Sequence, residues 1–96
     1  MKEYIRGEAA TIEDEFKDKG TLTTPNTSYT IEIDDPFKTN VVDGETMEVM
    51  STGVLRYNYA IADNATTGLY KADTIYVHKG VATKLRHRFR VKPEVG

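Results

Sequence analysis

The sequence contains no cysteine and no tryptophan, and it has only three prolines. Without cysteine the chain has neither disulfides nor thiolate metal ligands, a composition compatible with a reducing cytoplasm. The first residues form no apolar run of the kind found in a signal peptide. No segment approaches the roughly 20 apolar residues of a membrane-spanning helix. We therefore expect a cytoplasmic location, without a signal peptide and without a membrane partner.

Charge is divided unevenly along the chain. The formal net charge is −2, but residues 1–50 carry 12 acids against 5 bases, and residues 51–96 carry 3 acids against 8 bases. No run of like charge is long enough to predict a disordered tail. A length of 96 residues suits one domain. We expect one folded unit over residues 1–96, acidic in its first half and basic in its second.

Turn-forming residues recur at short intervals, and the runs between them are rich in Thr, Tyr, Val and Ile. This arrangement is typical of an antiparallel sandwich or barrel. Alternation of apolar and polar residues predicts strands over residues 28–34, 53–62 and 83–92. Gly53 and Gly68 are expected at turns that need a positive φ. The expected core consists of Ile12, Phe16, Ile31, Ile33, Leu55, Tyr57, Tyr59, Ile61, Tyr70, Leu85, Phe89 and Val91.

Three other segments have less regular patterns. Residues 68–79 change phase, which predicts a bulge near Asp73-Thr74. Residues 46–50 predict a short strand with Met47 and Val49 inward, after a hairpin turn at Asp43-Gly44. Residues 8–19 fit a helical stripe and a strand equally well, and the strand would place Asp14 on the inner face. The local pattern alone leaves that choice open.

A series of short motifs spans residues 4–91: Tyr4-x-Arg6-Gly7-Glu8, Lys19-Gly20, Tyr29-Thr30-Ile31-Glu32-Ile33, Asp35-Pro36, Thr52-Gly53-Val54-Leu55-Arg56-Tyr57-Asn58-Tyr59, Thr67-Gly68-Leu69-Tyr70 and Phe89-Arg90-Val91. Their order resembles that of bacterial and archaeal immunoglobulin-like domains of the macroglobulin (MG2) type. Arg6 stands where that family commonly has proline. The resemblance implies an immunoglobulin-like antiparallel β-sandwich of about seven strands in two sheets, with a strand over residues 8–19. Similar domains in phage, prophage and archaeal virus proteins imply a virion or tail-associated role.

The sequence predicts no catalytic residues and no cofactor. Ser28 and Ser51 lack the glycines of a nucleophile elbow, and no glycine-rich phosphate loop occurs. His78 and His87 would approach each other across a hairpin through Gly80, but two imidazoles are too few for a zinc site. We interpret His87 as a hydrogen-bonded, partly buried residue. The acidic clusters match no calcium-binding loop, so we expect no metal.

One strand carries a distinctive charge pattern, because basic residues occupy every second position near the C-terminus. At about 3.3 Å per residue they form a basic face about 26 Å long. Three interpretations compete: a solvated face opposite an acidic strand such as Glu13 and Glu15, a contact face for an acidic partner or a second copy, and a nucleic-acid site. The candidate interaction residues are Lys84, Arg86, Arg88, Arg90 and Lys92.

These observations together predict a non-enzymatic structural or assembly protein that presents a surface to a protein partner or to another copy of itself. A carbohydrate-binding module is the alternative, with Tyr4, Phe37 and Tyr76 as candidate exposed aromatic residues. Nucleic-acid binding through the basic strand is a further alternative. It is disfavoured because stacking aromatic residues are absent from the basic face.

Overall fold

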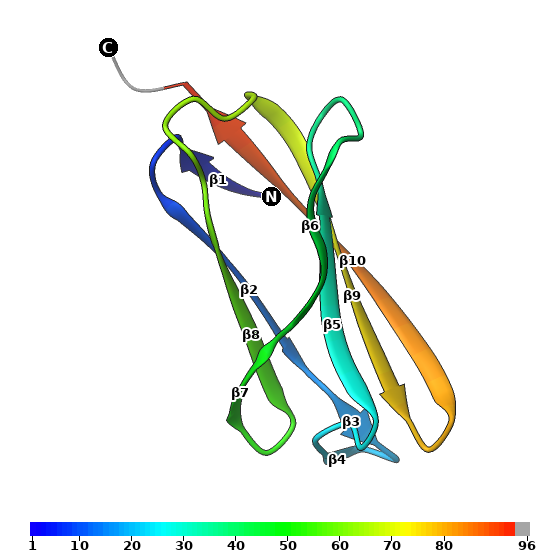
Figure 1. Ribbon diagram of the computed structural model, residues 1–96. Coiled ribbons are helices and arrows are strands. Elements are labelled where there is room, and N and C mark those ends of the chain that lie inside the picture. The colour runs from blue at the N-terminus through cyan, green and yellow to red at the C-terminus, as the bar shows by residue number, and fades with distance from the viewer. Residues whose placement is uncertain (94–96) are drawn as a thin grey trace.

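The computed structural model describes residues 1–93, which form ten β-strands and no helix (Figure 1). The predicted all-β class is confirmed, and residues 8–19 contain a strand. There are more strands than the seven or so expected, partly because β3 and β4 have only two residues each. The strands are β1 (Lys2–Ile5), β2 (Ala9–Glu15), β3 (Lys17–Asp18), β4 (Thr21–Leu22), β5 (Ser28–Asp34), β6 (Asn40–Thr46), β7 (Glu48–Ser51), β8 (Val54–Ala60), β9 (Gly68–His78) and β10 (Val81–Lys92).

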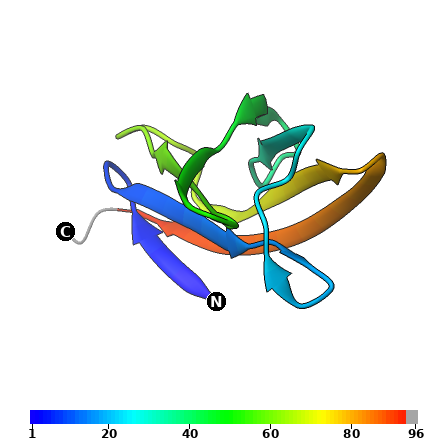
Figure 2. The ribbon, with the colours of Figure 1, turned by 90° about the horizontal axis from the view of Figure 1, so that it is seen from below.

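The strands form a sandwich. A five-stranded sheet has the order β1-β10-β9-β5-β6, a three-stranded sheet has the order β2-β8-β7, and β3 pairs with β4. All neighbours are antiparallel except β1, which runs parallel to β10. The long β9–β10 hairpin follows the long axis of a molecule measuring 47 × 23 × 19 Å. Figure 2 shows the two layers from one end.

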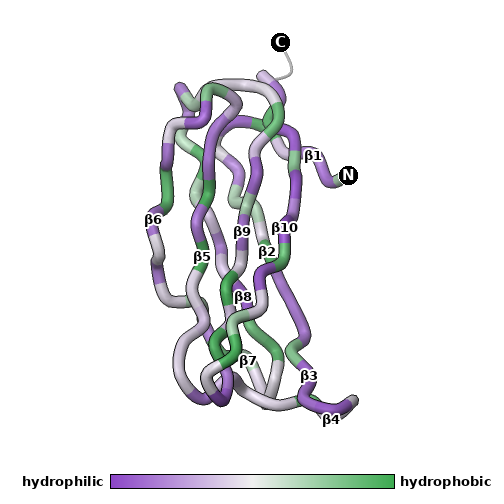
Figure 3. Tube along the Cα trace, turned by 90° about the vertical axis from the view of Figure 1, so that its right-hand side faces the viewer, coloured by the Kyte–Doolittle hydropathy of each residue, from purple (hydrophilic) through white to green (hydrophobic). Residues whose placement is uncertain are grey.

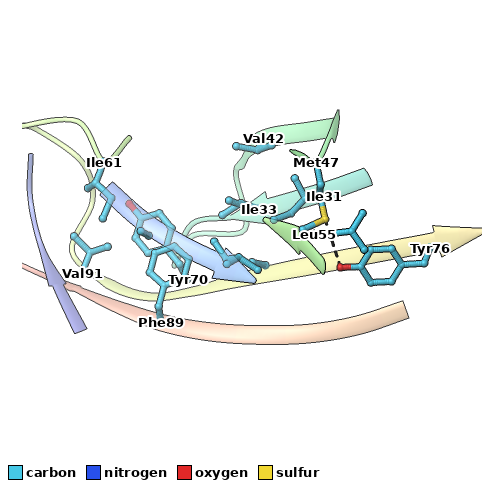
Figure 4. Packing of buried hydrophobic residues seen from close by; sticks show 13 residues of the cluster. Ile31, Ile33, Val42, Met47, Leu55, Ile61, Tyr70, Tyr76, Phe89 and Val91 are labelled. Carbon is cyan, nitrogen blue, oxygen red and sulfur yellow. Dashed lines mark hydrogen bonds between the residues drawn. The ribbon is translucent and has the colours of Figure 1, made fainter. Parts of the chain in front are cut away.

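Buried side chains from both sheets meet between the layers. Tyr70 of β9 stacks on Phe89 of β10, with ring centroids 5.2 Å apart. Toward the other end of the core, Tyr76 donates a hydrogen bond to Met47, and Leu55 lies beside this pair (Figure 4). Eight of the twelve expected core residues are buried, and Phe16, Tyr57 and Tyr59 are partly buried against them. The buried members of the expected set are Ile12, Ile31, Ile33, Leu55, Ile61, Tyr70, Phe89 and Val91.

Leu85 is the expected core residue that the structure places elsewhere: it is 39% exposed, because the smaller sheet does not extend over this part of β10. Eight expected residues are therefore buried, three are partly buried, and Leu85 is exposed. Val49 was also expected inside and is 40% exposed, whereas Met47 is buried as predicted. Met47 lies between β6 and β7, where the chain leaves the larger sheet for the smaller one.

The bulge lies at a different place from the one predicted. β9 keeps one register with both neighbours, and its inward positions include Thr74 and Tyr76 without a change of phase. Instead, Asp43 and Gly44 lie within β6, where the register with β5 shifts between Ile31 and Ile33. The predicted hairpin turn at Asp43-Gly44 is therefore wrong, and these two residues form a bulge opposite one residue of β5.

Gly53 and Gly68 both have positive φ, 74° and 130°, as predicted. At Gly53 the main chain also passes very close to other backbone. A Cβ atom there would lie 2.7 Å from Thr23 N and 2.9 Å from Phe16 O. Glycine is thus required at this position for space as well as for conformation.

Candidate interaction surface

The five basic residues predicted as an interaction surface all lie on the outer face of the five-stranded sheet, and all are exposed. They alternate with inward residues of β10 such as Phe89 and Val91, which are buried. Along β10 in Figure 3 the colour changes repeatedly between hydrophilic and hydrophobic. The period-two pattern of the sequence thus separates one basic face from one core face.

Part of this basic face is neutralised within the chain. Arg86 forms a two-pronged ion pair with Asp73, with Nε–Oδ1 and Nη2–Oδ2 distances of 2.8 and 3.0 Å. Lys84 Nζ lies 3.4 Å from the same carboxylate, and Lys92 Nζ lies 3.0 Å from Glu3 Oε2. The hydrogen bonds from Arg86 lower the pKa of Asp73, and this effect exceeds the opposing effect of burial.

Arg88 and Arg90 make no ion pair with any of residues 1–93. Arg88 lies directly across from Lys71 of β9 in the strand register. Like charges in opposed positions on adjacent strands repel each other. The acids expected opposite this face, Glu13 and Glu15, belong to β2 and pair in register with β8 instead. The isolated chain therefore keeps an excess of positive charge around Arg88.

The edge of β10 is only partly covered. β1 pairs with residues 89–92 of β10, and no strand in the described part of the chain pairs with the same edge of residues 81–88. β2 is likewise an edge strand of the smaller sheet. In Figure 2 β2 and β10 run in the lower half of the sandwich, with β1 and the β3–β4 hairpin below them. Val81, 66% exposed, and Leu85 are apolar side chains on the inward phase of this uncovered stretch.

A buried polar cluster lies between β2 and β9. Asp14 of β2 accepts hydrogen bonds at Oδ2 from Thr74 Oγ1 and Tyr76 OH, at 2.7 and 2.5 Å. His87 Nε2 lies 2.8 Å from Asp14 Oδ1, a contact that lacks the geometry of a hydrogen bond. Burial, together with the bond to Asp14, raises the pKa of Tyr76. A groove of about 390 Å³ adjoins the cluster and is lined by Lys2, Tyr4, Thr11, Ile12, Glu13, His87, Arg88 and Phe89.

The hydroxyl groups of this cluster are enclosed, since Thr74 is fully buried and Tyr76 is 1% exposed. The carboxylate of Asp14 on β2 accepts hydrogen bonds from Thr74 and Tyr76 on β9, and these bonds connect the two sheets. The sequence signal for the cluster was the inward position of an aspartate in an otherwise apolar phase. Nothing in the sequence indicated which residues of β9 would contact it.

The two histidines do not come together. His78 is opposite Val81 in the hairpin, whereas His87 is opposite Ala72, so the predicted approach through Gly80 is wrong. His78 Nδ1 accepts a hydrogen bond from the backbone N–H of Asn26 at 3.1 Å. His87 was expected to be partly buried and hydrogen-bonded; it is partly buried, but its Nε2 has no hydrogen-bond partner. No group of three or more potential metal ligands occurs among the described residues.

The three aromatic residues considered for carbohydrate binding do not form one platform. Phe37 is 79% exposed, Tyr4 is half-buried with its ring edge-on to Phe89, and Tyr76 is buried. The expectation that Tyr76 is exposed is therefore wrong. Its inward position is explained by its hydrogen bond to Asp14.

Comparisons of the chain with protein-family models, with curated proteins and with solved structures gave no match. Within residues 1–93 there is no helix long and apolar enough to cross a membrane.

Proposed function

We propose that this chain is a non-enzymatic structural or assembly module of immunoglobulin-like, macroglobulin (MG2) type, which binds an acidic protein partner through the outer face of β10. The observation that carries this proposal is the excess positive charge around Arg88. Arg88 and Arg90 form no ion pair among residues 1–93, and Arg88 is placed across from Lys71; the nearest acids in the strand register are Glu3 beside Arg90 and Asp34 beside Lys71. An acidic surface placed there relieves this repulsion and adds attraction.

The charge of this face is better suited to a protein than to nucleic acid. The acids Asp73, Glu32 and Asp34 occupy the adjoining strands of the same sheet, and Asp73 already binds Arg86. The outward positions of β9 and β10 carry no aromatic residue for stacking on bases. A protein partner with localised carboxylates matches this mixed pattern more closely than a continuous phosphate backbone does. A virion or tail-associated role is the setting that the family resemblance suggests for such a module.

A binding experiment with polyglutamate tests the proposal. Affinity is measured by isothermal titration at low and high salt, for the wild type and for the double variant Arg88→Glu/Arg90→Glu. We expect salt-sensitive binding that the double variant loses. The matched control is Lys17→Glu/Lys19→Glu, which changes the net charge equally at two exposed positions in and beside β3, near the β9–β10 turn rather than near Arg88 and Arg90. Equal loss of binding in both double variants, or no binding by the wild type, contradicts the proposal.

A further inference from the structure

The uncovered edge of β10 presents a regular set of backbone hydrogen-bonding groups. The β9–β10 hairpin turns through Lys79 and Gly80, both with positive φ, between the paired residues His78 and Val81. In such a two-residue hairpin the flanking pair is hydrogen-bonded, and bonded pairs then alternate along the ladder. The backbone N–H and C=O groups of residues 82, 84, 86 and 88 therefore point away from β9, toward the free edge.

The chain itself shows how this edge accepts a strand. β1 lies parallel to β10 beside residues 89–92. Its Glu3 is on the outer face and forms an ion pair with Lys92. Its next residue, Tyr4, points inward, and its ring packs edge-on against Phe89 with centroids 5.7 Å apart. At the centre of β1 an acidic residue thus lies outward and an aromatic residue lies inward against β10, whereas the end residues Lys2 and Ile5 do not continue this alternation.

The uncovered stretch offers the same two environments. Lys84, Arg86 and Arg88 project outward, in the same phase as Lys92. On the inward side Val81 and Leu85 are exposed. Val81 borders a groove of about 300 Å³ that is lined by Phe16 and by polar and charged residues, including Lys17 and Asp18 of β3. Side chains of a strand placed here would alternate between carboxylates over the bases and apolar groups over Val81 and Leu85.

We propose that residues 81–88 of β10 bind, by strand addition, an extended segment of a partner protein in which acidic and apolar residues alternate. The segment continues the line of β1 and is limited to about eight residues, because β1 occupies the edge beyond residue 88. Main-chain hydrogen bonds supply affinity, and the alternating side chains supply selectivity. This inference rests on the proposed function and specifies the conformation and pattern of the acidic partner.

A second copy of the chain is a poorer occupant. Pairing β10 with β10 of another copy brings two rows of lysine and arginine together, which is repulsive. The edge of β2, with Glu13 and Glu15 outward, has suitable charge. However, Tyr4 OH already contacts the backbone N–H of Thr11 on that edge, at 3.4 Å. A flexible acidic segment meets neither obstacle.

The test uses the full chain and fluorescent eight-residue peptides of alternating Glu and Val, with binding followed by anisotropy. Two modified peptides carry N-methyl groups on all Glu residues or on all Val residues. Only one of these two sets points at the edge, so we expect one methylated peptide to bind at least tenfold more weakly and the other to bind as the parent does. A peptide of alternating Lys and Val is expected not to bind.

Hydrogen exchange supplies an independent measurement. The amides of Lys84 and Arg86 are expected to exchange more slowly when the parent peptide is bound. The amides of Thr83 and Leu85 already face β9 and are expected to change little. Equal binding of both methylated peptides, or protection that does not alternate, overturns the inference.

The outcomes separate this inference from the proposed function. Binding of polyglutamate without binding of the Glu–Val peptide overturns strand addition and leaves the acidic-partner proposal standing. Failure of both ligands to bind overturns both. A dimer seen by light scattering that the peptide dissociates identifies a second copy as the occupant and also overturns the inference.

Discussion

Replacement of Asp14 by alanine removes the acceptor at the centre of the buried polar cluster. Tyr76 is 1% exposed and Thr74 is fully buried, so neither hydroxyl gains water easily once the carboxylate is gone. Their nearest alternatives are weak: Met47 Sδ lies 3.5 Å from Tyr76 OH, and the Leu85 carbonyl lies 3.5 Å from Thr74 Oγ1. The variant therefore leaves two buried donors without a good acceptor.

The size of the effect follows from these two donors. An unsatisfied buried polar group costs about 1–3 kcal/mol, and the weak alternatives place each hydroxyl in the lower half of that range. We expect Asp14→Ala to lower the free energy of unfolding by about 2–4 kcal/mol. A domain of this length has a total stability of about 5–14 kcal/mol, so the variant folds but unfolds at clearly lower denaturant.

Urea unfolding of Asp14→Ala, Tyr76→Phe and the double variant at neutral pH measures this coupling. The double variant lacks both the acceptor and one donor, so its loss of stability is expected to be smaller than the sum of the single losses by about 1 kcal/mol or more. Glu13→Ala, at the exposed neighbouring position, is the control and is expected to change stability by less than about 0.5 kcal/mol. Additive losses within about 0.5 kcal/mol would refute the account of Asp14 as a shared acceptor.

Three further predictions concern folding stability. Gly53→Ala is expected to lower the free energy of unfolding in urea by about 1–3 kcal/mol more than Gly80→Ala does. Both glycines have positive φ, but only Gly53 lies against other backbone. Equal losses of stability in the two variants would contradict this steric explanation. Phe89→Ala is expected to cost about 3–5 kcal/mol, and Leu85→Ala less than about 1 kcal/mol, because only Phe89 is buried; similar melting temperatures for the two variants would contradict the placement of β10. Because Arg86 lowers the pKa of Asp73 in the folded chain, the ionised carboxylate stabilises the fold above about pH 4, and this contribution is lost as the pH falls through the lowered pKa. Asp73→Asn is therefore expected to be less stable than the wild type at neutral pH and to lose less stability on acidification, as measured by urea unfolding across that range; parallel pH profiles would count against the ion pair.

The strands that alternate strictly could be predicted from the sequence because one face of each is buried. β5 begins and ends at the predicted residues, and the outward row of bases on β10 follows directly from period two. Alternation identifies the inward phase of a strand, but it does not say how far the opposite sheet extends. Leu85 shows this limit, because it has the phase of a core residue and lies where the smaller sheet gives no cover.

Contacts between distant segments were harder to predict. The sequence of β9 offers two apolar phases, one with Tyr70 and Tyr76 and the other with Ile75 and Val77. The buried phase contains the partners of Asp14, which lies about sixty positions earlier in the chain. A local pattern carries no information about that partner. The same limit explains why Asp73, rather than Glu13 or Glu15, neutralises Arg86: pairing between strands decides which acid lies across from each base.

The positive charge of β10 has opposite consequences for different strands that reach its edge. An uncovered edge with exposed apolar residues such as Val81 is a site where β-proteins aggregate, and basic side chains beside it repel a second β10. The same side chains attract a strand that carries carboxylates at alternate positions, just as Lys92 attracts Glu3, the single carboxylate of β1. Reducing the charge, for example with Lys84→Gln and Arg88→Gln, is therefore expected to weaken binding of the Glu–Val peptide and to increase self-association together. Light scattering at low salt, with and without that peptide, measures both changes. Weaker peptide binding without any increase in self-association would show that another feature keeps copies of β10 apart.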